Sequence, residues 1–249
     1  MLKNREFASY GNTQFVDQGL RNYMLKVYNY MAGGLAVTAL TSYLIITNPD
    51  IFRLFFYTSR SGYTPFGRFM LFAPFFLVFA FKWVIQSGTV KQLQTVFWIF
   101  SSSMGASLAP LFLGYTGISL TKTFLICSAT FGTLSLYGYT TKKDLTGMAT
   151  FLIMTLVGLL FATVVSIFLM FFNVIDMFSF LNSAGVSFIY VLIFAGLTAY
   201  ETQKLKEMYY ANSINEDGIQ RRAIAGALSL YLDFINMFTS LLRFFGDRK

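Results

Sequence analysis

Residues 223–245 read AIAGALSLYLDFINMFTSLLRFF, a stretch that is long and apolar enough to cross a lipid bilayer as one helix. It nevertheless carries Asp233 near its middle, where an ionised carboxylate is costly unless a partner or a water-filled cavity receives it. Polar side chains recur around this acid at spacings of four and three residues, which places them on one helix face. They are Ser229, Asp233, Asn236, Ser240 and Arg243. We interpret this stripe as facing a polar interior around which the other helices pack.

The rest of the chain has the composition of a membrane protein. Of its 249 residues, 55% are hydrophobic and only 12% are charged, which is about half the usual charged share. The net charge of +8 is spread between apolar runs, without the dense basic cluster that nucleic-acid binding needs, so no nucleic-acid partner is expected. The chain has no histidine and a single cysteine, which excludes a Ser-His-Asp triad and an intramolecular disulfide.

Apolar runs separated by short polar segments predict an all-α integral membrane protein with seven transmembrane helices, in a single domain of residues 1–249. Residues 1–24 are expected to form a polar N-terminal tail with a short amphipathic lead-in at the membrane surface. The predicted spans are residues 27–47, 69–85, 93–113, 120–139, 147–172, 178–200 and 223–245. The sixth is expected to continue as an amphipathic extension to Tyr210, and residues 212–218 are expected to form a turn.

The distribution of basic residues predicts the orientation of these spans. With the N-terminus inside, most of the 19 lysines and arginines fall in segments on the inner side. The positive-inside rule therefore favours a cytoplasmic N-terminus. The Gly33-Gly34 pair in the first span is expected to allow close packing of another helix.

Two carboxylates lie within predicted helices rather than in polar segments. Glu201 and Asp233 are sixteen residues on either side of Asp217, which lies in the predicted turn. If both arms are helical and antiparallel, the two acids lie at similar depth on adjacent helices. Two facing carboxylates in a low-dielectric site would share a proton or bind a cation between them. The pair is therefore a candidate proton or cation sensor, and a candidate metal site.

Structural roles for the same residues remain open. Glu201 could simply end a helix and pair with Lys204 one turn on, and Asp233 could be a buried hydrogen-bonded polar residue. Ser229, Asn236 and Ser240 either line a path for ions or hydrogen-bond neighbouring helices. Six basic residues fall toward the inner side, where they could latch the acids by an ion pair or face lipid headgroups. They are Lys82, Lys142, Lys143, Lys204, Arg221 and Arg222.

Enzymatic activity is not expected. Two intramembrane acids would suit an aspartic protease, but here one acid is a glutamate and the Gly-x-Gly-Asp pattern of presenilin-like proteases is missing from the sequence. The sequence also lacks a phosphate-binding P-loop and a Cys/His metal cluster. No cofactor is expected.

Several segments resemble the Bax inhibitor family, also called the transmembrane Bax-inhibitor-motif family. They are YNYMAGGLAVTALTSY (residues 28–43), YGYTTKKDL (137–145), YETQKLK (200–206) and LSLYLDFINMFTSLLRFFG (228–246). The last two are the most specific, and the similarity runs over essentially the whole chain. The lead-in DQGLRNYMLKVYNYM (17–31) is similar to the bacterial branch, which implies the inner (plasma) membrane of a bacterium.

The resemblance implies a seven-helix fold whose last helix is central, and a pH-dependent calcium leak. It implies that Glu201 and Asp233 form the pH sensor, with glutamate at position 201 where the family usually has aspartate. The extra methylene preserves the charge but changes its reach. The family's basic latch partner is not identified by the motifs, and Lys82 is the nearest candidate by region. Calcium is then the permeant ion, and the bilayer and cations are the expected partners.

Two functions of other classes remain open. The first is a regulatory membrane protein that binds and modulates a membrane protease or a cell-death factor, with the polar N-terminal tail as a docking segment. The second is a proton-coupled transporter, which predicts a flux that saturates with a solute and moves protons with it.

Overall fold

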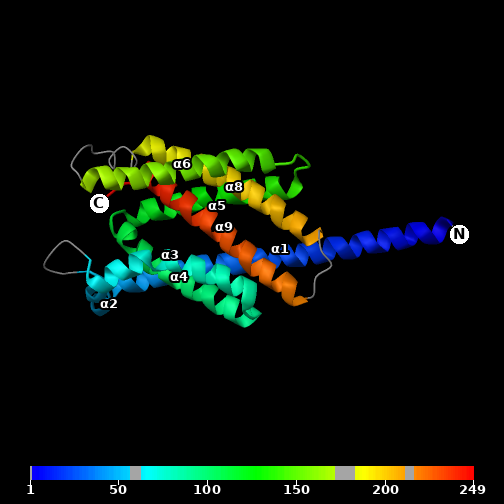
Figure 1. Ribbon diagram of the computed structural model, residues 1–249, viewed down its shortest axis with the longest axis horizontal. Coiled ribbons are helices and arrows are strands. Elements are labelled where there is room, and N and C mark those ends of the chain that lie inside the picture. Colours follow the sequence, from blue (N-terminus) through cyan, green and yellow to red (C-terminus); the bar gives the residue numbers. More distant parts are fainter. Residues whose placement is uncertain (1, 57–62, 172–182, 211–215) are drawn as a thin grey trace. The chain divides into compact units, whose positions relative to one another are not determined.

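The computed structural model describes residues 2–56, 63–171, 183–210 and 216–249, with side chains for residues 18–56, 63–166, 183–210 and 216–249. Within these residues the regular structure is helical, apart from two isolated β-bridges (Figure 1). The helices are α1 (Leu2–Thr47), α2 (Pro49–Phe55), α3 (Pro65–Ser87), α4 (Val90–Leu113), α5 (Gly117–Thr140), α6 (Thr146–Phe171), α8 (Ala184–Tyr210) and α9 (Glu216–Phe245). The all-α prediction is confirmed for this part of the chain.

Six helices of the described chain are long and apolar enough to cross a membrane, namely α1, α3, α4, α6, α8 and α9. The predicted count of seven spans is not confirmed, because α5, which contains the predicted span 120–139, does not join them. With 24 residues, α5 is long enough, but Lys122 and its many threonines and serines lower its mean hydropathy.

Burial differs strongly among the six candidate spans. In α9, 72% of the apolar window is buried, whereas the window of each other span is at most 44% buried. At the other extreme, only 6% of the α6 window is buried, so this helix presents most of its surface to lipid. α9 is therefore the most enclosed of the six candidate spans.

The helix ends differ most from the sequence-based boundaries at the starts of α1 and α9. α1 begins at Leu2, so the polar tail and the first span belong to one continuous helix. The first proline of the chain is Pro49, so no proline interrupts helix formation before that point. α9 begins at Glu216, inside the predicted turn, because acidic residues favour the N-terminal end of a helix. α8 reaches Tyr210 as predicted, whereas its predicted start, residue 178, lies outside the described residues.

Polar residues begin several of these helices. Asn48 caps α2 and Thr64 caps α3, and each is followed at once by a proline, whose missing N–H would find no helical partner in the first turn anyway. At the start of α4, the Gln92 side chain accepts from the Thr89 N–H at 2.8 Å. The Thr89 hydroxyl in turn accepts from the Gln92 N–H at 3.3 Å. This capping box defines a sharp turn between α3 and α4.

The chain forms two compact units. Unit 1 comprises residues 1–107 and 205–228, and unit 2 comprises residues 108–204 and 229–249. The boundaries fall inside α4, α8 and α9 rather than in flexible linkers of the kind that usually separate domains.

In unit 1, α1 and α4 approach closely through small residues. A β-carbon added to Gly34 would lie 2.9 Å from the Phe97 ring and 3.0 Å from the Ser101 hydroxyl, so a larger residue would push the helices apart. The Thr38 hydroxyl donates to the Ser101 carbonyl at 2.9 Å across this contact. The predicted packing role of the glycine pair is confirmed.

In unit 2, the end of the chain packs onto the turn between α4 and α5. The Lys249 N–H donates to the Gly114 carbonyl at 3.0 Å, and the Thr116 N–H donates to the Asp247 carbonyl at 3.2 Å. The Asp247 N–H also donates to the Ser119 hydroxyl at 3.0 Å. These bonds hold the C-terminal end of α9 against unit 2.

Candidate functional site: a carboxylate pair

Asp233 lies in the part of α9 that belongs to unit 2, and its side chain is only 7% exposed. Its Oδ2 atom is buried and has no hydrogen-bond partner among the described residues. A buried polar atom without a partner is rare in folded proteins and costs free energy. The alternative that Asp233 is simply a satisfied buried residue is therefore not supported at this oxygen.

The other members of the predicted polar stripe differ in burial. Ser240 is buried like Asp233, whereas Ser229 and Asn236 are half-buried and Arg243 is exposed. Burial therefore alternates along the stripe, and only its last member, Arg243, is exposed. Whether Ser229, Asn236 and Ser240 line an ion path stays a prediction.

Glu201 lies in α8, also within unit 2, and is close enough to Asp233 for the two carboxylates to interact electrostatically. Whether the two acids share a proton or bind a cation stays a prediction. The Glu201 Oε1 atom lies 3.5 Å from the Lys204 Nζ atom, one turn along the same helix. The Lys204 ammonium also lies 5.5 Å from the centre of the Tyr200 ring. The ion pair with Lys204 that the sequence suggested is therefore present, but Glu201 does not end a helix, because α8 continues to Tyr210.

α5 contacts both α8 and α9, the helices that carry the two acids (Figure 1). Toward α8, the hydroxyls of Ser135 and Thr202 lie 3.0 Å apart, next to Glu201 in sequence. Toward α9, Phe131 packs edge-on against Phe234, the neighbour of Asp233, with ring centres 5.5 Å apart. The buried Cys127 thiol donates weakly to the Phe234 carbonyl at 3.8 Å, so this cysteine serves packing. Thus α5, a long helix that is not among the candidate membrane spans, contacts both helices that carry the acids.

Gln203 is a positioning residue that the sequence analysis missed. Its side chain is 6% exposed and bridges the loop between α5 and α6. Its Oε1 accepts from the Leu145 N–H at 3.0 Å, and its Nε2 donates to the Lys143 carbonyl at 2.8 Å. In the sequence, a glutamine near the end of an amphipathic helix looks the same whether its side chain is exposed to solvent or clamps a loop. Its place two residues after Glu201, in the motif YETQ, is the only pointer to it.

Replacing Gln203 with Leu is expected to destabilise the protein by roughly 1–3 kcal/mol, because the buried Leu145 N–H would lose its acceptor. Thermal unfolding of the purified protein in detergent measures the effect as a lower melting temperature. The matched control is Gln86→Leu, an exposed glutamine on α3, whose melting temperature should be unchanged. Equal melting temperatures for both variants would show that the clamp contributes nothing.

Asp144, in the loop that Gln203 contacts, differs from Asp233 because it is exposed to solvent. Its Oδ1 accepts from the Thr146 N–H at 2.8 Å at the start of α6. This hydrogen bond to the charged form holds the pKa of Asp144 below its usual value. Asp144 therefore stays ionised at neutral pH and provides a control for the buried Asp233.

The predicted latch base Lys82 is exposed on α3 in unit 1, whereas the ion pair of Glu201 is made by Lys204 in unit 2. A latch role for Lys82 stays a prediction. As a metal site the pair is small: the described residues contain no group of three or more His, Cys, Asp or Glu side chains suited to a metal. Calcium in a resident site takes six to eight oxygen ligands, so two carboxylates would suit an ion in passage better.

These features define a class of protein: a helical integral membrane protein with a carboxylate pair inside its membrane-spanning helices. A family model described as "Inhibitor of apoptosis-promoting Bax1" matches residues 20–249. The chain belongs to the Bax inhibitor-1 family, as its motifs predicted.

Similar bacterial proteins cover almost the whole chain. The chain is 42% identical over 233 residues to uncharacterized protein RP147 of Rickettsia prowazekii, covering 94% of this chain and 92% of the relative. It is 40% identical over 237 residues to an uncharacterized protein of Caulobacter vibrioides, with coverage of 94% and 92%. It is 37% identical over 232 residues to inner membrane protein YbhL of Escherichia coli, with coverage of 93% and 94%.

Proposed function

We propose that this protein is a pH-dependent calcium leak channel of the bacterial inner membrane, gated by the Glu201–Asp233 pair. The observation that carries the proposal is the Oδ2 atom of Asp233, which is buried in the most enclosed span without a hydrogen-bond partner among the described residues, in an acid that Glu201 influences electrostatically. The inner-membrane assignment is supported by the similarity to YbhL, which is described as an inner membrane protein. The cytoplasmic N-terminus follows from the distribution of basic residues.

Protonation gives the pair two states. Two charged carboxylates repel each other strongly where water is excluded, and either a shared proton or a cation removes the repulsion. Because Glu201 is on α8 and Asp233 is on α9, the repulsion acts between two helices, so the protonated and charged forms favour different helix spacings. Lys204 makes a salt bridge with Glu201 but none with Asp233 in the described chain. We therefore assign the pH response of the proposed gate mainly to Asp233.

Calcium flux into liposomes that contain the purified protein, measured over a pH series, tests the proposal. The double variant Glu201→Gln, Asp233→Asn keeps the size of both side chains and removes both charges. We expect the wild-type flux to change with pH and the flux of the double variant to be independent of pH. If the double variant kept both the wild-type flux and the wild-type pH response, the proposal would be wrong.

The description of the family model favours a second candidate function. It names an inhibitor of an apoptosis-promoting factor, which suits a regulatory protein that binds another membrane protein. Crosslinking in native membranes followed by purification would test for a stoichiometric protein partner. If deletion of residues 1–17 removed the cellular activity while calcium flux persisted, binding would be the better account.

A further inference from the structure

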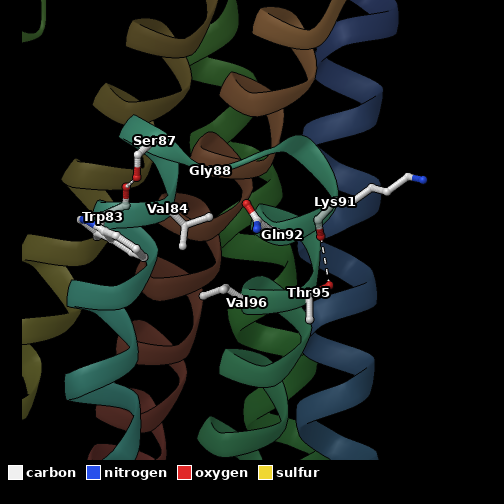
Figure 2. Close-up of a pocket in the computed structure, with 8 residues that line it drawn as sticks. All are labelled: Trp83, Val84, Ser87, Gly88, Lys91, Gln92, Thr95 and Val96. Atoms are coloured by element: carbon white, nitrogen blue, oxygen red, sulfur yellow. Dashed lines mark hydrogen bonds between the residues drawn. The ribbon is translucent and has the colours of Figure 1, made fainter.

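A pocket opens at the turn between α3 and α4, within unit 1. Its volume is about 610 Å³, and it is lined by Trp83, Val84, Ser87, Gly88, Lys91, Gln92, Thr95 and Val96. Figure 2 shows the side chains of Val84, Gln92 and Val96 between the two helices, with Trp83 at one edge and Lys91 extending outward from the other. No residue of the carboxylate pair lines this pocket.

The walls of the pocket change from polar to apolar along its length. The turn end carries Ser87 and Gln92, and the deeper wall is made of valine side chains and the Trp83 ring. The hydroxyls of Ser87 and Thr95 donate to the carbonyls one turn earlier in their own helices, so they are already satisfied. A ligand that fits needs a polar end at the turn and an apolar part below it.

The position of the turn in the membrane is restricted by its neighbours. α3 and α4 are both candidate membrane spans, and only a short turn joins them, so the turn lies at the level of the lipid headgroups. Trp83, one turn before the end of α3, is 72% exposed, as expected for a tryptophan at the membrane–water interface. The deeper, apolar part of the pocket then lies at the level of the acyl chains.

The charge around the turn is positive. Lys91 is exposed in the first turn of α4, and it has no ion-pair partner among the described residues. The Arg221 guanidinium, from α9 in the same unit, donates through Nη2 to the carbonyl of Gly88, a lining residue. Its Nε atom is buried without a hydrogen-bond partner in the described chain. No acidic residue lines the pocket.

We propose that this pocket binds an anionic phospholipid, with the phosphate headgroup near Lys91 and the Gly88 turn and an acyl chain against Trp83 and Val96. The match in charge, the polar-to-apolar walls and the headgroup-level position all point to the same ligand. Gly88 allows the tight turn beside the pocket, since a β-carbon there would lie 2.6 Å from the Val84 side chain. The site is separate from the carboxylate pair and does not depend on the proposed channel function.

The two tryptophans of the chain allow a direct test. A Trp98→Phe variant leaves Trp83 as the only fluorescent tryptophan, and the protein is reconstituted in phosphatidylcholine vesicles that contain a minority of brominated lipid. Brominated phosphatidylglycerol should quench Trp83 as though it were enriched about fivefold over brominated phosphatidylcholine, the enrichment expected for one basic contact. Equal quenching by the two lipids would overturn the proposal.

Charge variants identify the residue responsible. Lys91→Gln, made in the Trp98→Phe protein, should remove most of the preference for phosphatidylglycerol. The matched control Lys122→Gln removes an equal charge from an exposed position on α5 and should keep the preference. Because Lys91 is exposed, its replacement leaves the fold intact. An unchanged preference in Lys91→Gln would contradict the assignment of the headgroup contact.

Two further measurements test whether the preferential quenching of Trp83 comes from bound lipid. A Trp83→Phe variant leaves Trp98 as the reporter, and this residue should show no preference between the brominated lipids. Inorganic phosphate, compared with chloride at equal ionic strength, should not reduce the preference of Trp83. If phosphate abolished it, the site would bind a free anion and the lipid assignment would be wrong.

Discussion

Replacing Asp233 with Asn is expected to produce a protein whose calcium flux no longer responds to pH. Asn has nearly the same shape but does not take up a proton, so the repulsion with Glu201 is permanently absent. A gate coupled to one proton changes its equilibrium by up to about tenfold per pH unit. In the Asn variant the flux should change by less than about twofold over the same pH range. The measurement is calcium flux in liposomes from mildly acidic to mildly alkaline pH.

Two matched variants make this result interpretable. Asp144→Asn removes the same charge from an exposed loop and retains an acceptor for the Thr146 N–H, so the pH response should be unchanged. Asp233→Glu keeps the titratable group, so a pH response should remain with a displaced midpoint. If Asp233→Asn retained the full wild-type response while Asp144→Asn lost it, the gate would lie in the loop and not in the carboxylate pair.

The second large effect is expected from Gly138→Ala at the contact between α5 and α8. A β-carbon on Gly138 would lie 2.8 Å from the carbonyl carbon of Ala199 and 3.0 Å from its α-carbon. The obstacle is backbone, which does not rotate away as a side chain would, so the helices must separate. Overpacking of this kind costs roughly 1–3 kcal/mol, and thermal unfolding in detergent should show a clearly lower melting temperature.

Gly132→Ala, on the same helix, is the matched control. A β-carbon at Gly132 meets no atom within 4 Å, and alanine is favoured over glycine inside a helix by about 0.5–1 kcal/mol. This control should therefore match or exceed the wild-type melting temperature. If both alanine variants behaved alike, close approach of α5 and α8 would not be what holds Thr202 and Glu201 in place.

Both predictions depend on the same part of unit 2. α5 touches α8 through Gly138 and Ser135, and it touches α9 through Phe131 and Cys127. A change at Gly138 acts on the distance between the acid-bearing helices, whereas a change at Asp233 acts on the charge between them. Comparing the pH response of the two variants therefore separates a geometric disturbance of the gate from loss of its proton-binding group.

Much of the site was predictable from local properties of the chain. The two acids stood out because charged residues are rare inside apolar helices, and their equal spacing from Asp217 predicted that they lie near each other. The pairing of Glu201 with Lys204 followed from helical periodicity. Helix ends were less predictable: α1 runs on through a polar segment, and α9 begins before Gly218. Helix propagation past a polar segment depends on backbone hydrogen bonding, which hydropathy does not record.

The sequence by itself determined that this is a helical membrane protein of the Bax inhibitor-1 family with an acid in its last span, because apolarity, period and motifs are properties of neighbouring residues. Only the tertiary structure decided that Asp233 Oδ2 is buried with no partner among the described residues, that Gln203 clamps the α5–α6 loop and that the polar α5 contacts both acid-bearing helices. These facts depend on the rotation and spacing of helices, which are set by side chains from distant parts of the chain packing together.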